Sequence, residues 1–153
     1  MSEGALAPGI PPDYYDRIAD VEDRHWWYLG MRRITETLLG ERLRRPGARI
    51  LDAGCGTGGV LRWALDHGSF ASSAGIDIGA AAIELARRRV PEADLRVGSL
   101  RDLPFADNAF DLALMNDVLQ HVPEDEVDAS LGELRRVLAS AGALHLSVPQ
   151  ACH

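Results

Sequence analysis

The spacing of apolar positions along the chain changes once, near residue 46. Before that point it is helical: Ile18 and Val21 mark a short first helix after Asp13. A second helix carries an apolar face made of Trp27, Met31, Ile34 and Leu38. The Pro46-Gly47 pair ends this helical region.

After residue 47, short apolar runs alternate with helical spacing. The helices resume at Val60 and Leu61 after a glycine cluster, at 80–90, and at 124–139. The predicted strands are 48–53, 73–78, 94–98, 110–115 and 143–148. Strands that alternate with helices predict an α/β fold, a Rossmann-like, doubly wound parallel sheet preceded by N-terminal helices.

The length and composition fit one domain. The chain has 153 residues, 46% of them apolar, which is enough for a core without disulfide or metal staples. Residues 1–12 hold three prolines and little that can pack, so we expect a flexible lead-in. We expect residues 13–153 to form the single domain, with N-terminal helices at 13–45 and the core at 48–149.

Charge and composition exclude several kinds of function. All sixteen basic residues are Arg, so a Walker-type phosphate loop and a Schiff-base lysine are excluded. A net charge of −7 disfavours a nucleic-acid partner. Cys55 and Cys152 have no metal-ligand spacing, and no metal site is expected. With neither a targeting segment nor a membrane span, we expect a cytoplasmic protein.

The first predicted strand ends in a glycine-rich turn, Asp52-Ala53-Gly54-Cys55-Gly56-Thr57-Gly58. In a doubly wound sheet the ligand lies beyond the carboxyl ends of the strands, beside the first strand. Glycines there let the backbone approach a ligand and adopt a positive φ. A plain strand-to-helix connection would need only one or two glycines, so this turn indicates a ligand site.

The second predicted strand ends at Asp77, the only acid between Asp66 and Glu84. A carboxylate at this place can accept hydrogen bonds from a ribose diol. The alternative is that Asp77 caps the helix that begins near Ala80. The ribose interpretation leaves two cofactors open, because the glycines of this turn also fit the nicotinamide pattern G-x-G-x-x-G.

Five segments resemble class I S-adenosylmethionine-dependent methyltransferases of the type 11 and 12 domains. ILDAGCGTG at 50–58 resembles their first motif and GIDIGAAAIELAR at 75–87 their second-strand segment. VGSLRDLPFADNAFDLALMNDVLQHV at 97–122 and ELRRVLASAGALHLSVP at 133–149 resemble the segments that follow. YYDRIADVEDRHWWYLGMRRI at 14–34 is similar to a branch with a His-Trp-Trp segment before the core. The resemblance implies the strand order 3-2-1-4-5 and methyl transfer from S-adenosyl-L-methionine to a small-molecule acceptor.

The resemblance also implies site residues, which we carry over one by one. Asp52 and the glycine turn (Gly54, Cys55, Gly56 and Gly58) would surround the methionine part of the cofactor, and Asp77 would hold the ribose. The adenine would lie against Ile78, with Ser99 and Leu100 at its edge, although many relatives have Asp in place of Ser99. Asn116 would bound the sulfonium, and Asp117 would line the acceptor mouth.

Other residues admit two interpretations each. His121 is either a general base for the acceptor or a residue that orients its loop. Trp26 and Trp27 are packing residues or a lid over the cofactor cation. Arg32 and Arg33 either form a solvated face, which we favour, or reach the cofactor carboxylate. His67 and His145 are expected to be structural.

The chain departs from the family after its fifth predicted strand. Relatives continue with two further strands, so we expect either a fragment or a partner that covers the exposed edge, such as a second copy in a homodimer. Two functions of other classes stay open beside methyl transfer: a cofactor-binding module without turnover, and a nicotinamide oxidoreductase. Methyl transfer from labelled cofactor, and cofactor titration followed by tryptophan fluorescence, would distinguish them.

Overall fold

The computed structural model describes residue 11 and residues 13–149. The expected lead-in over 1–12 therefore lies almost wholly outside the described residues. The helices are α1 (Tyr14–Val21), α2 (Trp26–Leu43), α3 (Gly59–His67), α4 (Ala80–Arg89), η1 (Leu119–His121), η2 (Glu124–Glu126) and α5 (Val127–Val137). The strands are β1 (Ala48–Ala53), β2 (Phe70–Asp77), β3 (Asp94–Val97), β4 (Phe110–Asn116) and β5 (Leu138–Ser147).

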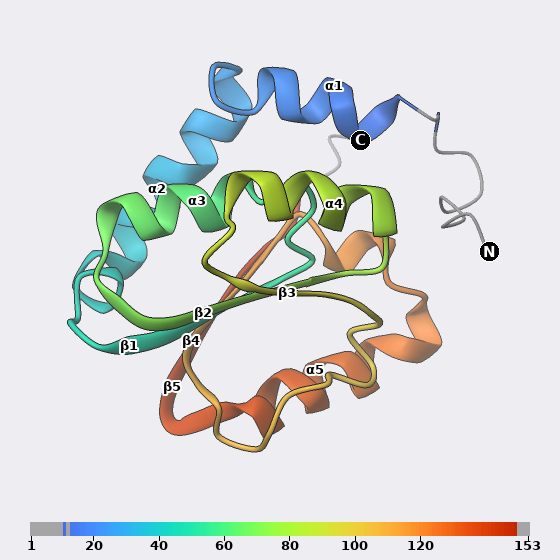
Figure 1. Ribbon diagram of the computed structural model, residues 1–153. Helices are drawn as coiled ribbons and strands as arrows, with labels where there is room; N and C mark the ends of the chain where they lie inside the picture. Colours follow the sequence, from blue (N-terminus) through green and yellow to red (C-terminus); the bar gives the residue numbers. More distant parts are fainter. Residues whose placement is uncertain (1–10, 12, 150–153) are drawn as a thin grey trace.

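The five strands form one sheet in the order β3-β2-β1-β4-β5, with every neighbouring pair parallel. This confirms the Rossmann-like fold and the strand order that the resemblance implied. Figure 1 shows α1 to α4 on one side of the sheet and α5 on the other. The central strand β1 is covered on both faces, and five of its six residues are buried.

Each face of the sheet has its own apolar core. One core packs Ile50, Leu112 and Leu114 against α3 and α4, and Leu39 and Leu43 of α2 join it. The other core packs Leu51 and Met115, with neighbours from the sheet, against Leu134 and Val137 of α5. Side chains alternate between the two faces along each strand, so Asp52 shares the face of Ile50, toward α2 and α3.

The apolar face predicted for the second helix is wrong in its C-terminal half. Ile34 and Leu38 are 51% and 67% exposed. The residues that α2 buries are instead Thr35, Leu39, Gly40 and Leu43. The helix turns a polar residue inward because Thr35 finds a partner there: its Oγ1 and Nε2 of the buried His145 in β5 lie 3.1 Å apart.

Three further boundaries differ from the sequence prediction. Strand β2 begins at Phe70 rather than at residue 73. The helix predicted over 124–139 begins with the 3₁₀ turn η2 and ends at Val137. Strand β5 begins at Leu138 rather than at residue 143, through an irregular register between Phe110 and Leu112 of β4. Leu138 pairs with Phe110 and Ala143 pairs with Leu112, so the four residues between them on β5 form a bulge opposite a single residue of β4.

Two kinds of feature are absent from the described residues. None of the helices in this part of the chain has the length and hydropathy needed to cross a membrane. Within residues 13–149 and Pro11, no group of three or more His, Cys, Asp or Glu residues is arranged to hold a metal ion.

Candidate functional site

The three glycines of the turn after β1 have different surroundings. Gly54, Gly56 and Gly58 all have a positive φ, of 79°, 51° and 84°. A Cβ on Gly58 would lie 3.2 Å from Cα of Ala86, so this glycine lets α4 pack closely against the turn. A Cβ on Gly56 would have no atom within 4 Å. Gly56 is therefore the glycine that leaves free space for a ligand.

The carboxylate of Asp77, at the end of β2, accepts hydrogen bonds from two backbone amides. Its Oδ2 accepts a hydrogen bond of 2.9 Å from the amide of Gly56, and its Oδ1 accepts one of 2.8 Å from the amide of Gly79. The N-cap residue of α4 is Gly79, and α4 has no side-chain cap, so Asp77 binds the amide just before the helix and does not itself cap it. Each carboxylate oxygen has a second lone pair, which can accept a hydrogen bond from a ribose hydroxyl.

Asp52, at the end of β1, is a buried acid with an unused oxygen. The residue is 2% exposed, and Oδ2 has no hydrogen-bond partner. Burial raises the pKa of Asp52 to about 7, and the neighbouring charges of Asp77 and Glu22 add to the shift. A buried, unpaired carboxyl is costly, and its cost falls if a cationic or hydrogen-bonding ligand group approaches it.

Cys55 contributes only its backbone to the turn. The thiol faces the core, where a Cβ on Gly75 would lie 2.9 Å from Sγ, and the residue is 6% exposed. Burial raises the pKa of this thiol well above its ordinary value. Its amide donates to the carbonyl of Ile76 in β2, so the amide fixes the turn against the neighbouring strand.

A cleft of about 130 Å³ opens beside the turn. Gly54 of the turn and His121 line it, together with the four residues expected around the nucleoside: Asp77, Ile78, Ser99 and Leu100. Ile78 is 72% exposed there, as an apolar surface for a flat ring would be. The amide of Arg101 donates to Ser99 Oγ at 3.3 Å, and that oxygen keeps a further lone pair for a ligand.

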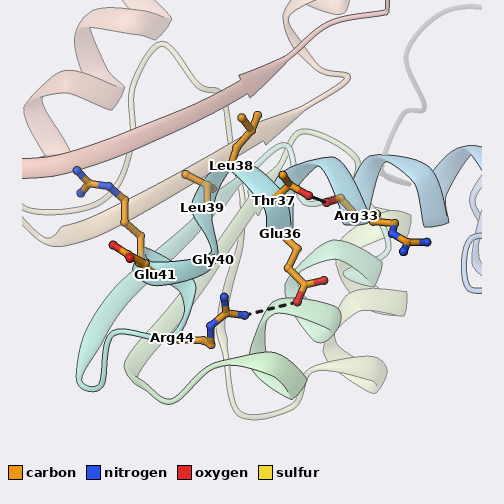
Figure 2. Close-up of a pocket in the computed structure, with 9 residues that line it drawn as sticks. Arg33, Glu36, Thr37, Leu38, Leu39, Gly40, Glu41 and Arg44 are labelled. Atoms are coloured by element: carbon orange, nitrogen blue, oxygen red, sulfur yellow. Dashed lines mark hydrogen bonds and ion pairs between the residues drawn. The ribbon is translucent and has the colours of Figure 1, made fainter.

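A larger hollow of about 560 Å³ lies along the surface of α2, and no residue of the glycine turn lines it (Figure 2). Its lining is mostly charged or polar, including Arg33, Glu36, Glu41 and Arg44, and Glu36 forms an ion pair with Arg44. All of its lining residues come from α2 and the residue after it, and none ends a strand. We therefore assign the site to the smaller cleft.

The end of β4 is joined to the N-terminal helices. The indole nitrogen of Trp27 donates to Asp117 Oδ2 at 3.2 Å, while Trp26 is 71% exposed. Asp117 has a positive φ of 56°, which is uncommon for a residue other than glycine, and its Oδ1 is buried without a partner. Asn116 Oδ1 accepts from the hydroxyl of Ser147 in β5. Trp27 thus packs at the site, whereas the Trp26 ring is exposed to solvent.

Two residues near the N-terminus have surroundings that the sequence analysis did not predict. The Arg32 side chain is only 10% exposed, so the solvated face that we favoured for it is wrong. Glu22 is buried and bonds to Thr57 of the glycine turn and to Arg89 of α4. One feature of the sequence could have indicated that Glu22 is buried: it is an acid that directly follows the apolar residues of a short helix.

These features fit a zwitterionic nucleoside such as S-adenosylmethionine. The free space at Gly56 admits the ligand backbone, and the unpaired Oδ2 of Asp52 can receive a cationic group. Asp77 and Ile78 lie together in the cleft where a ribose and a flat base would be held. The fold and the site therefore define a nucleotide-cofactor protein of the doubly wound α/β class.

Comparisons with known proteins identify the family. The model of the methyltransferase domain matches residues 51–146. The 2-phytyl-1,4-naphtoquinone methyltransferase of Trichormus variabilis is 38% identical over 134 residues, which are 81% of this chain and 58% of that protein. This chain therefore belongs to the methyltransferase domain family, as the resemblance implied, and its cofactor is S-adenosylmethionine. It spans little more than half the length of that relative.

Solved structures agree with this assignment. A SAM-dependent methyltransferase from Methanosarcina mazei is 31% identical, with a TM-score of 0.62 over 71% of this chain and 55% of that one. A protein from Methanococcus maripaludis has a TM-score of 0.79 over 97% of this chain and 67% of its own, at 18% identity. The second likeness shows the fold alone.

Proposed function

We propose that the protein transfers the methyl group of S-adenosylmethionine to a small-molecule acceptor. The observation that supports this most is the cleft lined by Gly54 and Asp77, where two backbone amides fix the Asp77 carboxylate. Residues 13–149 would act as one cofactor-binding unit, with no nucleic-acid partner because of the acidic net charge of −7.

When bound, the cofactor supplies a methyl group already activated on a sulfonium sulfur. The protein therefore has to position and shield the reaction rather than activate the electrophile. In this proposal Asp77 orients the ribose, and Ile78, Ser99 and Leu100 hold the base. Asn116, kept in place by Ser147, bounds the sulfonium side from the end of β4.

Transfer of isotope from methyl-labelled S-adenosylmethionine to a panel of small acceptors tests the proposal. The phytyl-naphthoquinone named for the relative suggests including apolar quinones in the panel, beside carboxylic acids and amines. A chain that binds the cofactor but labels no acceptor, while a full-length relative labels its own in the same assay, would favour the cofactor-binding module instead.

We propose His121 as the general base for an acceptor that must lose a proton. It lines the cleft at the end of the 3₁₀ turn η1, and its ring lies 3.5 Å from the side-chain nitrogen of Gln120. His121→Ala should then lower turnover by roughly 10² or more, with unchanged affinity for S-adenosylhomocysteine. Equal turnover in both proteins from pH 6 to 9 would make His121 a loop residue.

The outer edge of β5 is proposed as a surface for a second copy of the chain. Ser147 O accepts from the amide of Asp117, the residue after β4, so the alternating backbone groups of Leu144 and Leu146 point to the open side. Such an edge can pair with another strand. Light scattering over a range of concentrations tests for the dimer, and a monomer throughout would refute it.

The proposed compartment is the cytoplasm, where Cys55 would stay reduced.

A further inference from the structure

The aromatic side chains of the protein are concentrated in its N-terminal helices. Helix α1 and the first turn of α2 contain all three tyrosines and two of the three tryptophans. With His25 they form a group that we call the aromatic cluster: Tyr14, Tyr15, His25, Trp26, Trp27 and Tyr28. The rings of Trp26 and Trp27 lie edge to face with centroids 5.8 Å apart. The rings of Tyr14 and Tyr15 do the same at 5.3 Å.

The aromatic cluster contacts the candidate site at two acids. The indole nitrogen of Trp27 donates to Oδ2 of Asp117, the residue after β4. The hydroxyl of Tyr15 lies beside Asp77 of β2, because a Cβ on Gly79 would lie 2.5 Å from that hydroxyl and 3.2 Å from Asp77 Oδ1. The cluster therefore extends from the acid proposed to hold the ribose to the end of β4, where the sulfonium side is proposed to lie.

Tyr28 lies between these two contacts. Burial raises its pKa, and the neighbouring Tyr14, Glu22 and Asp117 raise the pKa further. These neighbours come from α1, from the end of that helix and from the end of β4, so Tyr28 lies where the three segments meet. Its hydroxyl stays protonated at neutral pH, so the ring adds no negative charge to the cluster.

Two features of the cluster are not explained by packing between α1 and α2. Trp26 is 71% exposed and Tyr14 is 40% exposed, and large apolar groups in contact with water are typical of binding surfaces. Oδ1 of Asp117 is buried and has no hydrogen-bond donor among the described residues, although Oδ2 receives the indole of Trp27. A ligand with an apolar face and a hydrogen-bond donor satisfies both features.

We propose that the aromatic cluster binds the methyl acceptor, and that the acceptor is a flat aromatic molecule that carries a hydroxyl or amino group. Its ring packs against Trp26, and its O–H or N–H group donates to Oδ1 of Asp117. Aromatic rings in contact gain more than their buried area alone provides. This inference rests on the proposed methyl transfer and names the class of acceptor for that reaction.

A lid over the cofactor is the competing explanation for Trp26. In that role the ring would shield the sulfonium cation through a cation–π contact instead of binding an acceptor. The two roles predict effects on different ligands, because S-adenosylmethionine carries the cation and S-adenosylhomocysteine does not. Removal of a lid changes the ratio of these two affinities, whereas removal of an acceptor surface leaves the ratio unchanged.

The first test uses the native chain saturated with S-adenosylhomocysteine, so that no methyl group can be transferred. Calorimetry compares 2-naphthol with decahydro-2-naphthol, which keeps the hydroxyl and loses the flat ring. We expect 2-naphthol to bind about threefold to tenfold more tightly. The saturated compound is at least as apolar, so burial of apolar surface alone does not favour 2-naphthol. Equal binding, or tighter binding of the saturated compound, overturns the proposal.

Substitution of Trp26 tests the ring itself. Trp26→Leu keeps an apolar side chain and should weaken 2-naphthol about threefold to tenfold, with less than about twofold change for S-adenosylhomocysteine. Trp26→Phe keeps a ring and should retain most of the affinity for 2-naphthol. Leu38→Ala is the matched control, because Leu38 is 67% exposed on the same helix and lies outside the cluster. If Trp26→Leu weakens S-adenosylmethionine alone, the ring is a lid and the acceptor surface is refuted.

Asp117→Asn tests the hydrogen bond to the acceptor. Asparagine tolerates the positive φ of this position, and its one carbonyl oxygen can still accept from Trp27. An NH₂ group then replaces the oxygen that would bind the acceptor. In the native chain 2-naphthol should bind about tenfold more tightly than 2-methoxynaphthalene, which has no donor. In Asp117→Asn this ratio should fall to about one, and an unchanged ratio contradicts the bond.

Failure of this inference can be distinguished from failure of the proposed function. A chain that binds S-adenosylhomocysteine but none of the naphthalenes refutes the aromatic acceptor and leaves methyl transfer standing. A chain that binds 2-naphthol with the expected preferences but transfers no labelled methyl group to any acceptor supports the aromatic surface and contradicts methyl transfer.

Discussion

At the scale of single residues, the acids of the site are prepared for their ligand in opposite ways. Asp77 is held by the amides of Gly56 and Gly79, so its carboxylate is oriented before any ligand arrives. Asp52 has an oxygen with no partner and is nearly unexposed to water. Because Asp77 is already oriented, a ligand that binds it loses less conformational entropy on binding. The unpaired oxygen of Asp52 destabilises the ligand-free protein, and a ligand that donates a hydrogen bond to it removes this penalty.

We expect the two functions of Asp77 to be separable by substitution. Asp77→Ala removes the acceptor for both amides and the ribose, so it should lower the melting temperature and weaken S-adenosylhomocysteine by at least about tenfold. Asp77→Asn keeps one acceptor oxygen, so it should weaken binding with a smaller change in stability. Calorimetry and thermal melting measure the two effects. Unchanged affinity in both variants would remove Asp77 from the ribose site.

Asp52 should make the stability of the ligand-free protein fall with rising pH. Its pKa is raised from 3.8 to about 7 in the fold. A raised pKa gives a contribution that is complete below the unfolded value and is lost as the pH rises through the folded value. The loss between about pH 4 and pH 7 is roughly 4 kcal/mol at most. Asp52→Asn should lack this slope.

Urea unfolding at a series of pH values measures this difference. The comparison between the native chain and Asp52→Asn isolates Asp52, because the other titrating groups are common to both proteins. Parallel pH curves for the two proteins would contradict the buried, protonatable state of Asp52.

At the scale of elements, the segment between β3 and β4 is held in place by one arginine of α5. Arg136 donates to the carbonyls of Leu103 and Phe105 at 2.9 and 2.8 Å, and pairs with Asp107 and Glu133. Glu133 in turn accepts from the amide of Leu103 at 2.7 Å. This segment follows Ser99 and Leu100 of the cleft, so its position depends on these contacts.

Arg136→Met should therefore loosen the 103–107 segment and destabilise the protein by roughly 2 kcal/mol. The partial exposure of the pair keeps the figure this low. Hydrogen exchange at the amide of Leu103 is the local readout, and Arg135→Met on the exposed side of α5 is the control.

The contact between Arg136 and Glu133 also makes the stability of the protein depend on pH. Hydrogen bonds from Arg136 lower the pKa of Glu133 to about 2. A lowered pKa gives stability that is present above the ordinary value of 4.5 and is lost as the pH falls through 2, a window below that of Asp52.

If the amide of Leu103 exchanges equally in Arg136→Met and in the native chain, the segment is held by other contacts.

Helix α2 shows where periodicity stops being informative. Its apolar residues Ile34 and Leu38 predict one face, and the helix buries another that includes Arg32 and Thr35. Arg32 and Thr35 have their partners outside α2: Asp23 lies in the turn before the helix, and His145 lies in β5. No local pattern in α2 contains that information, so the sequence alone led to the wrong face and to a solvated Arg32.

At the scale of the whole molecule, the parts of the site that the sequence predicted are those next to strand ends. Asp52, Asp77 and the glycines follow directly from strand periodicity and turn composition, and they lie together because parallel strands end at one edge. The contributions of Glu22 and Trp27 depend on how two N-terminal helices dock on that edge. Docking is set by contacts between distant residues, which a single sequence does not display.

The strand order has a consequence for the order of folding. The central strand β1 comes first along the chain, and its two neighbours arrive at very different times: Asp52 pairs with Gly75 of β2 and, much later, with Leu114 of β4. Nearby pairings close smaller loops and cost less entropy, so β1 and β2 should associate first. During synthesis the edge of β1 that later pairs with β4 would have no partner until β4 leaves the ribosome. Pulse-labelling hydrogen exchange during refolding should show amides of β2 protected before those of β5.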